Sequence, residues 1–216
     1  MRILKFAKVD YLKTARYNYL LLGFPLLAVF ILVTSMDSQA LFAMAYCLFA
    51  GIILAAFPIN ISSETERGFL QMLPSKPGEL ILGHYLYGFL MILAAFLTGV
   101  LALAAAKLLH PVLQILRIGG VDVSGVYPVM LGIALVFTGL EDLLLTALRF
   151  ENAHLTQLLR IVPAFIFFFG FNSASHKVME LPDFSTMTGL AALGVCLLLY
   201  AVFALAGRAI SIRRGE

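Results

Sequence analysis

The sequence predicts an all-α polytopic membrane protein with six transmembrane helices and both termini in the cytoplasm. Of its 216 residues, 62% are hydrophobic and 12% are charged, whereas a soluble domain is nearer half apolar and a quarter charged. A water-soluble fold of this size has too little interior to bury so much apolar surface. This composition argues against a soluble enzyme, a secreted disulfide scaffold and a nucleic-acid binder.

Long apolar runs recur along the chain, and each is close to the length of about 20 residues that a transmembrane helix needs. The six runs cover residues 19–36, 40–60, 80–106, 126–148, 155–171 and 188–207. Glu141 and Asp142 interrupt the fourth run, and the short fifth run contains Pro163. An alternative in which residues 141–155 lie along the membrane interface therefore stays open, and it leaves the number of crossings even.

The lysines and arginines predict the orientation. Twelve of the 15 lie before the first run, in the second-to-third and fourth-to-fifth connections, or in the C-terminal tail. The other three are Lys107, Arg117 and Lys177. Cationic loops stay in the cytoplasm, so both termini are expected there, with residues 172–187 outside. The chain is therefore expected to be a multi-pass protein of a bacterial plasma membrane.

The first 18 residues are typical of a basic amphipathic helix. At 100° per residue, apolar side chains gather on one half of the helix and five cations on the other. Two residues depart from this pattern: the acidic Asp10 lies near the apolar half, and the apolar Leu12 lies near the cationic half. Such a helix is expected to lie in the cytoplasmic interface against anionic headgroups. The alternative is an ordinary cationic flank with no regular structure. The apolar half holds Phe6, Tyr17, Ile3, Ala7, Tyr11, Leu4 and Ala15.

The connection at residues 61–79 predicts a short cytoplasmic helix. Ser63 and Glu66 form a capping box, and the helix is expected to end before Pro74. It carries polar Glu64, Glu66, Arg67 and Gln71 together with apolar Phe69, Leu70, Met72 and Leu73. The element is either a loop whose side chains only cap its own helix ends or a docking surface for a cytoplasmic partner. The second alternative is considered because four large apolar residues are many for a short exposed loop.

Few residues indicate chemistry. No lysine follows a glycine, so a Walker A phosphate loop is absent. Cys47 and Cys196 lie in apolar runs and are interpreted as packing residues, and the four single histidines are interpreted as interfacial residues with no metal site. Glu141 and Asp142 form a candidate intramembrane polar site. They are either a relay or substrate contact, or an acidic pair at the cytoplasmic boundary with Arg149 as a partner.

The second-to-third connection also carries a family resemblance. Residues 57–85 resemble ABC-2 type transporter permeases, and more narrowly the small six-span permeases that include the phenol-soluble modulin exporter subunits. The shared features are an acidic segment, the turn Leu73-Pro74-Ser75-Lys76 and a following span that begins near Tyr85. The sequence differs at Pro77-Gly78, where more polar residues are common, and at Gly68, where an aromatic residue is common.

The resemblance implies a non-catalytic permease subunit of an ABC exporter that pairs with a second copy or a paralogue. A separate ABC ATPase would bind ATP and magnesium, so this chain needs no cofactor of its own. Residues 61–79 would then be the coupling helix, with Glu64, Glu66, Arg67, Phe69, Leu70, Met72 and Leu73 at the ATPase interface. Residues 1–18 would be the connecting helix. Amphipathic or lipophilic cargo, such as peptides or drugs, suits the apolar spans.

Two other functions fit the composition. A vitamin-capturing subunit of an energy-coupling transporter has a similar length and number of spans, and it would bind one small ligand tightly. A membrane-embedded enzyme would use Glu141 and Asp142 in catalysis. Neither alternative accounts for the capped cytoplasmic helix between the second and third spans.

Overall fold

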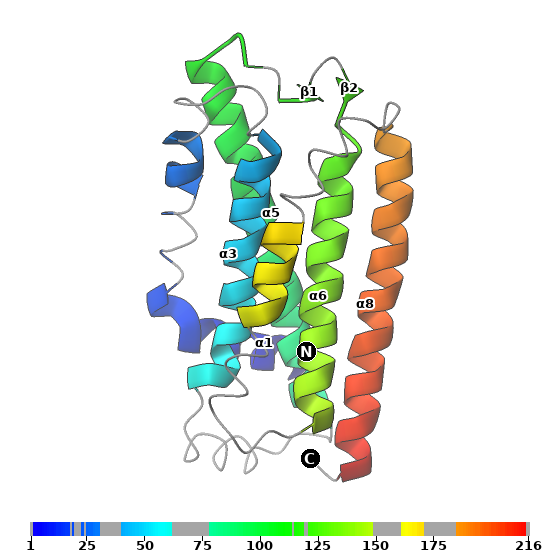
Figure 1. The fold of residues 1–216 in the computed structure, drawn as a ribbon. Coiled ribbons are helices and arrows are strands. Elements are labelled where there is room, and N and C mark those ends of the chain that lie inside the picture. The colour runs from blue at the N-terminus through cyan, green and yellow to red at the C-terminus, as the bar shows by residue number, and fades with distance from the viewer. Residues whose placement is uncertain are drawn as a thin grey trace.

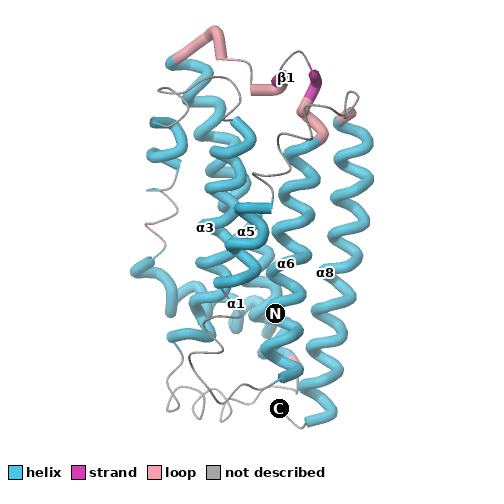
Figure 2. The backbone as a smooth tube through the Cα atoms, viewed as in Figure 1, coloured by secondary structure: helices cyan, strands magenta, loops and turns pink. Residues whose placement is uncertain are grey.

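The computed structural model describes residues 2–17, 19, 23, 25–30, 40–61, 78–113, 115–118, 121–148, 161–170 and 185–214. Apart from two strands of two residues each, the regular structure in these ranges is helical (Figure 2). The elements are α1 (Arg2–Thr14), η1 (Ala15–Tyr17), α3 (Ala40–Ile61), α5 (Glu79–Leu109), β1 (Arg117–Ile118), β2 (Val121–Asp122), α6 (Val126–Leu148) and α8 (Thr186–Arg214). Residues 25–30 and Ile161–Gly170 are also helical.

The long helices α3, α5, α6 and α8 run side by side, and α1 lies across them near one end of the bundle (Figure 1). The chain termini lie toward this same end. The antiparallel β1–β2 hairpin, in which Arg117 pairs with Asp122, lies at the other end. A transverse amphipathic helix beside upright apolar helices is the arrangement expected at a membrane interface.

Most of the predicted spans coincide with observed helices. Three are long and apolar enough to cross a membrane: Glu79–Leu109, Val126–Ala147 and Thr186–Arg213. The shorter apolar helices Ala40–Ala56 and Ile161–Gly170 fall within the second and fifth predicted runs. Of the first run, only residues 19, 23 and 25–30 are described. The described residues therefore form a helical protein with three helices that are long and apolar enough to cross a membrane.

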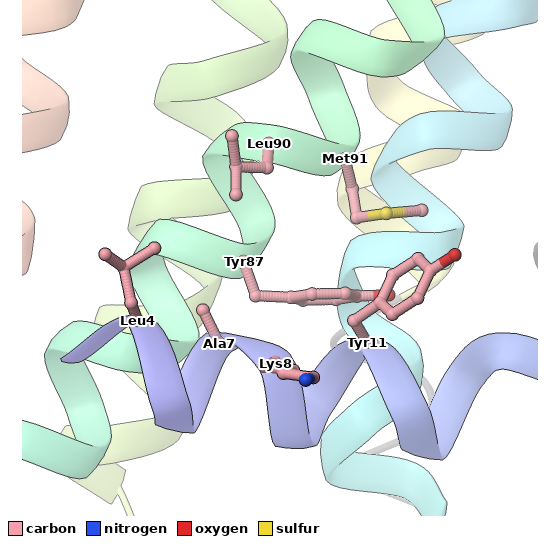
Figure 3. A pocket seen from close by; sticks show the side chains of 7 residues that line it. All are labelled: Leu4, Ala7, Lys8, Tyr11, Tyr87, Leu90 and Met91. Carbon is pink, nitrogen blue, oxygen red and sulfur yellow. The ribbon is translucent and has the colours of Figure 1, made fainter. Parts of the chain in front are cut away.

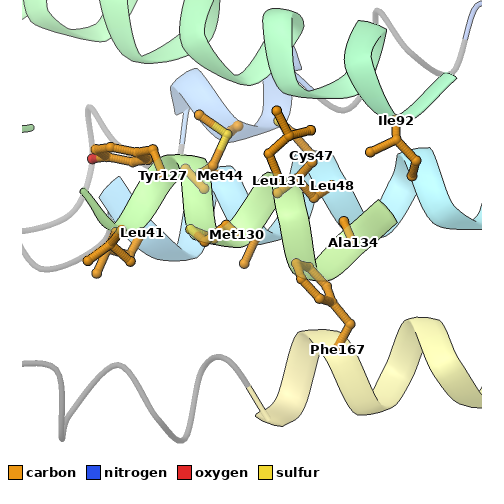
Figure 4. Packing of buried hydrophobic residues seen from close by; sticks show 14 of the residues in the cluster. Leu41, Met44, Cys47, Leu48, Ile92, Tyr127, Met130, Leu131, Ala134 and Phe167 are labelled. Atoms are coloured by element: carbon orange, nitrogen blue, oxygen red, sulfur yellow. The ribbon is translucent and has the colours of Figure 1, made fainter. Parts of the chain in front are cut away.

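The core lies between α3, α5 and α6, where small residues let the helices approach closely. A Cβ atom built on Gly51 of α3 would lie 2.5 Å from the Ala95 Cβ of α5, and one on Gly99 would lie 2.7 Å from the Met44 sulfur. Phe167 of the helix Ile161–Gly170 points toward α6 near Ala134 (Figure 4), where its ring centroid lies 6.3 Å from that of Phe137. Gly51 could not carry a side chain without separating α3 from α5, and a side chain at Gly99 would require Met44 to move.

The start of α5 contacts the end of α8. Gly78 has a positive φ of 80°, which favours glycine because it has no Cβ atom. A Cβ at Gly78 would also lie 2.7 Å from the Arg208 Cγ. The predicted sixth span stops at residue 207, whereas α8 continues to Arg214. The extra turns of α8 provide the surface on which Gly78 packs.

Candidate functional site: a buried polar link between α1, α5 and α6

The site begins where α1 crosses α5. A Cβ atom built on Gly83 would lie 2.4 Å from the Phe6 Cβ and 3.2 Å from the Ala7 backbone nitrogen. Glycine at this position therefore brings the backbone of α1 into direct contact with α5. Phe6, Ala7, Asp10 and Thr14 form the buried face of α1, and the segment is helical from Arg2 to Thr14.

The buried carboxylate of Asp10 is explained by a histidine on α5. Nδ1 of His84 lies 3.2 Å from Oδ2 of Asp10, and Nε2 lies 3.1 Å from Oδ1 of Asp142 on α6. All three residues are at most 9% exposed. One imidazole thus links three helices that are far apart in the sequence.

The two hydrogen bonds of His84 require two protons. A carboxylate only accepts hydrogen bonds, and a neutral imidazole has one N–H group. The trio is therefore either an imidazolium between two carboxylates or a neutral imidazole with one protonated carboxyl group, and its net charge is −1 in both forms. The second Asp142 oxygen, Oδ2, accepts no hydrogen bond from the described residues, and it lies 3.8 Å from a Cβ built on Gly88.

A second polar contact joins α1 to α5 one turn further along each helix. The hydroxyl oxygens of Thr14 and Tyr87 lie 2.8 Å apart, and the Tyr87 hydroxyl also donates to the Leu54 carbonyl of α3 at 3.3 Å. The Thr14 hydroxyl lies 3.1 Å from the Asp10 carbonyl of its own helix. Together with the Asp10–His84 pair, these bonds fix the position of α1 on the bundle.

Tyrosines extend the polar link to α8. The Tyr200 hydroxyl of α8 donates to the Tyr85 carbonyl at 2.6 Å, and the Tyr85 hydroxyl donates to the Gly139 carbonyl of α6 at 3.3 Å. The two rings meet edge to face with their centroids 5.7 Å apart. A displacement of α5 at this level therefore acts on α1, α6 and α8 together.

The predicted polar pair Glu141 and Asp142 lies on α6 and is buried, with 3% and 4% of each residue exposed. Both residues lie within two turns of the end of α6 at Leu148, which agrees with a position near a membrane boundary. Asp142 pairs with His84, a residue of another helix. Arg149, the partner considered from the sequence, lies outside the described residues.

The predicted ATPase-coupling residues Glu64, Glu66, Arg67, Phe69, Leu70, Met72 and Leu73 lie outside the described residues. The helices on either side are described: α3 ends at Ile61 and α5 begins at Glu79. Within the described part of the chain, no group of three or more His, Cys, Asp or Glu side chains could hold a metal ion.

Sequence reasoning missed two members of the buried link, Asp10 and His84. The available signal was the acidic residue near the apolar half of the amphipathic helix, where an unpaired carboxylate would be costly. His84 was interpreted as an isolated interfacial residue, because its partners are 74 and 58 positions away in the chain. Two buried carboxyl groups on different helices need a hydrogen-bond donor between them, and His84 is that donor.

Upright apolar helices, a transverse amphipathic helix and a buried polar link between them define a polytopic helical membrane protein. The model of the ABC-2 family transporter protein family matches residues 8–214. The chain therefore belongs to the ABC-2 transporter family, as the resemblance at residues 57–85 predicted. No curated protein and no solved structure matches the chain.

Proposed function

We propose that the chain is the transmembrane permease subunit of an ABC exporter, with six helices that cross the plasma membrane of a bacterium. The observation that carries this proposal is the family match, which spans nearly the whole chain. The three membrane-crossing helices and the cation count support it. Both termini lie toward one end of the bundle (Figure 1), which supports an even number of crossings with the termini in the cytoplasm. Family membership favours this function over a vitamin-capturing subunit or a membrane-embedded enzyme.

An ABC ATPase that binds ATP and magnesium would dock on residues 61–79. Three features support this location: the sequence pattern of a capping box at Ser63 and Glu66, the apolar residues that follow it, and its place between α3 and α5. Those two helices pack on each other through Gly51 and Ala95. A movement of the connection would therefore reach a helix pair that is already in close contact.

The helix α1 acts as the connecting helix in this proposal. Its polar contacts with His84 and Tyr87 join it to the start of α5, only a few residues after the connection ends. When ATP closes the ATPases, rigid helices rock and change the accessibility of a cavity between two permease copies or paralogues. Differential affinity of the two states for amphipathic or lipophilic cargo, such as peptides or drugs, then produces transport.

The experiment has a topology arm and an activity arm. In a variant with Cys47→Ala and Cys196→Ala, a single cysteine at Ser63→Cys is labelled by a membrane-impermeant maleimide from the cytoplasmic side only. The matched single cysteine Ser175→Cys is labelled from the outside only. Labelling of Ser63→Cys from the outside would contradict the proposal.

For the activity arm, the chain is purified together with the ABC ATPase that binds it. The chain alone is expected to hydrolyse no ATP. Glu66→Ala and Phe69→Ala are expected to abolish stimulation of the ATPase while the permease stays folded. Glu180→Ala, on the opposite predicted side, serves as the control. Full stimulation by variants throughout residues 62–76 would contradict the coupling role.

A further inference from the structure

The crossing of α1 over α5 leaves an apolar groove on one flank of α1. Its volume is about 240 Å³. Side chains of α1 form one wall and side chains of α5 form the other (Figure 3). The main lining residues are Leu4, Lys8 and Tyr11 of α1 and Tyr87, Leu90 and Met91 of α5.

The groove lies on the outer surface of the bundle, because several of its lining residues are exposed. Leu4 is 63% exposed, Tyr11 is 51% exposed and Leu90 is 45% exposed. Because α5 crosses the membrane, its exposed apolar residues face lipid. An upright helix offers lipid a convex surface, whereas the transverse α1 closes one end of this surface and makes it concave. An acyl chain that lies along Leu90 and Met91 would therefore end at α1.

The charge at this end of the groove is positive. Lys8 is the charged residue among the groove-lining side chains, and it is exposed. Lys5, one turn earlier on α1, is also exposed. Asp10 lies on the other flank of α1 and pairs with His84, so it does not offset these lysines at the groove. An anionic headgroup at the membrane surface is the complement of this arrangement.

We propose that the groove binds one anionic phospholipid, with an acyl chain against Leu90 and Met91 and the phosphate group at Lys8. The ring of Tyr87 lines the groove, and its hydroxyl bonds to Thr14 of α1 and to the Leu54 carbonyl of α3. The lipid therefore packs over the junction that holds α1 in place. Bound lipid stabilises the docked position of α1, because a ligand stabilises the state that binds it.

This proposal depends on the position of the chain in a membrane and not on the ATPase. Its test uses the purified full-length chain in detergent and native mass spectrometry. The probes are palmitoyl-oleoyl phosphatidylglycerol and palmitoyl-oleoyl phosphatidylcholine, which have the same acyl chains. One phosphatidylglycerol is expected to bind at least fivefold more tightly than phosphatidylcholine, which is about the effect of one lysine near a membrane surface.

Lys8→Gln is expected to lower the affinity for phosphatidylglycerol about fivefold and to affect phosphatidylcholine less, because the phosphatidylcholine headgroup carries no net charge. Lys13→Gln is the matched control, since it removes the same charge from the other flank of α1, outside the groove. Leu90→Trp places a bulky aromatic ring in the groove and is expected to weaken the binding of both lipids. Equal losses from Lys8→Gln and Lys13→Gln would overturn the proposal, because they would indicate general attraction to a basic helix. Unchanged binding by Leu90→Trp would also overturn it.

Discussion

The two halves of α5 hold their neighbours in different ways. In the first half, between Gly83 and Gly88, hydrogen bonds of His84, Tyr85 and Tyr87 connect α5 to α1, α6 and α8. In the second half, Ala95, Gly99, Ala102 and Ala106 are buried without charged partners among the described residues. Their small size allows α3 to pack closely.

This difference shows how one helix can be held by fixed packing along one half and by contacts that depend on protonation along the other. Packing of small residues depends on shape and does not change with protonation. The trio of Asp10, His84 and Asp142 depends on two shared protons, and each of its bonds ends on a different helix. The first half therefore holds the contacts that can be broken one at a time, and it is also the half closest to the predicted coupling connection.

Removal of the shared donor is expected to have the largest effect. His84→Ala leaves Asp10 and Asp142 buried without their partner, and loss of one partner from a buried charge pair costs about 3–5 kcal/mol. The free energy of unfolding, measured by titration of micelles with a denaturing detergent, should fall by that amount.

Thr98→Val is the control for this variant. Thr98 lies in the second half of α5, and its hydroxyl bonds to the Ala95 carbonyl of the same helix at 2.9 Å. Its replacement should change the free energy of unfolding by less than about 0.5 kcal/mol. Equal losses in the two variants would contradict the distinction between the halves of α5.

Two glycine variants test the α1–α5 contact and the α3–α5 contact separately. Each is expected to lower the free energy of unfolding less than His84→Ala does. Gly83→Ala and Gly51→Ala each place a Cβ atom within 2.5 Å of a neighbouring Cβ atom, and overpacking of this kind costs about 1–3 kcal/mol. The losses of stability should be similar, but the displaced helices differ. Gly83→Ala moves α1 from α5, whereas Gly51→Ala moves α3 from α5.

Fluorescence can report the difference, because the chain has no tryptophan. Tyr17→Trp places a single reporter where Tyr17 packs on the buried cluster around Tyr87. Its emission should shift to longer wavelength with Gly83→Ala and stay unchanged with Gly51→Ala. The same shift in both variants would show that α1 does not depend on its contact at Gly83.

The smallest effect is expected at the hairpin end. The Ser124 backbone N–H donates to the Asp122 carboxylate at 2.9 Å and lowers the pKa of that group below its ordinary value of 3.8. A lowered pKa adds stability above the ordinary value, and the contribution is lost as pH falls through the lowered pKa. Between about pH 6 and about pH 3, Asp122→Asn should therefore lose slightly less thermal stability than the wild type. A larger loss in the variant would contradict the assignment.

The helices could be predicted from sequence because their signals are local. The fourth predicted run and α6 have the same bounds, residues 126–148, and α1 follows from its 3.6-residue periodicity. The packing stripe on α5 was harder to predict. A four-residue repeat predicts Ala94, Thr98, Ala102 and Ala106, whereas the buried line runs through Ala95 and Gly99 before it reaches Ala102. The facing surface of α3 selects among adjacent small residues, and no local pattern encodes that choice.

The candidate site could be predicted only in part. Glu141 and Asp142 stand out in the sequence because acids are costly in a membrane. Their environment did not follow, because Asp10 and His84 meet Asp142 only after α1 folds back across α5. The β1–β2 hairpin was also missed, since two residues in each strand produce no alternating pattern.

The contact between Gly78 and Arg208 has a practical consequence for protein engineering. A bulky fusion or affinity tag after Arg214 would sit on the last turns of α8, the same turns that press on the beginning of α5. Such a tag would disturb the contact between α8 and the start of α5, through which residues 61–79 are proposed to act. Reporters are better inserted in residues 172–184, ahead of α8 and on the opposite predicted side of the membrane.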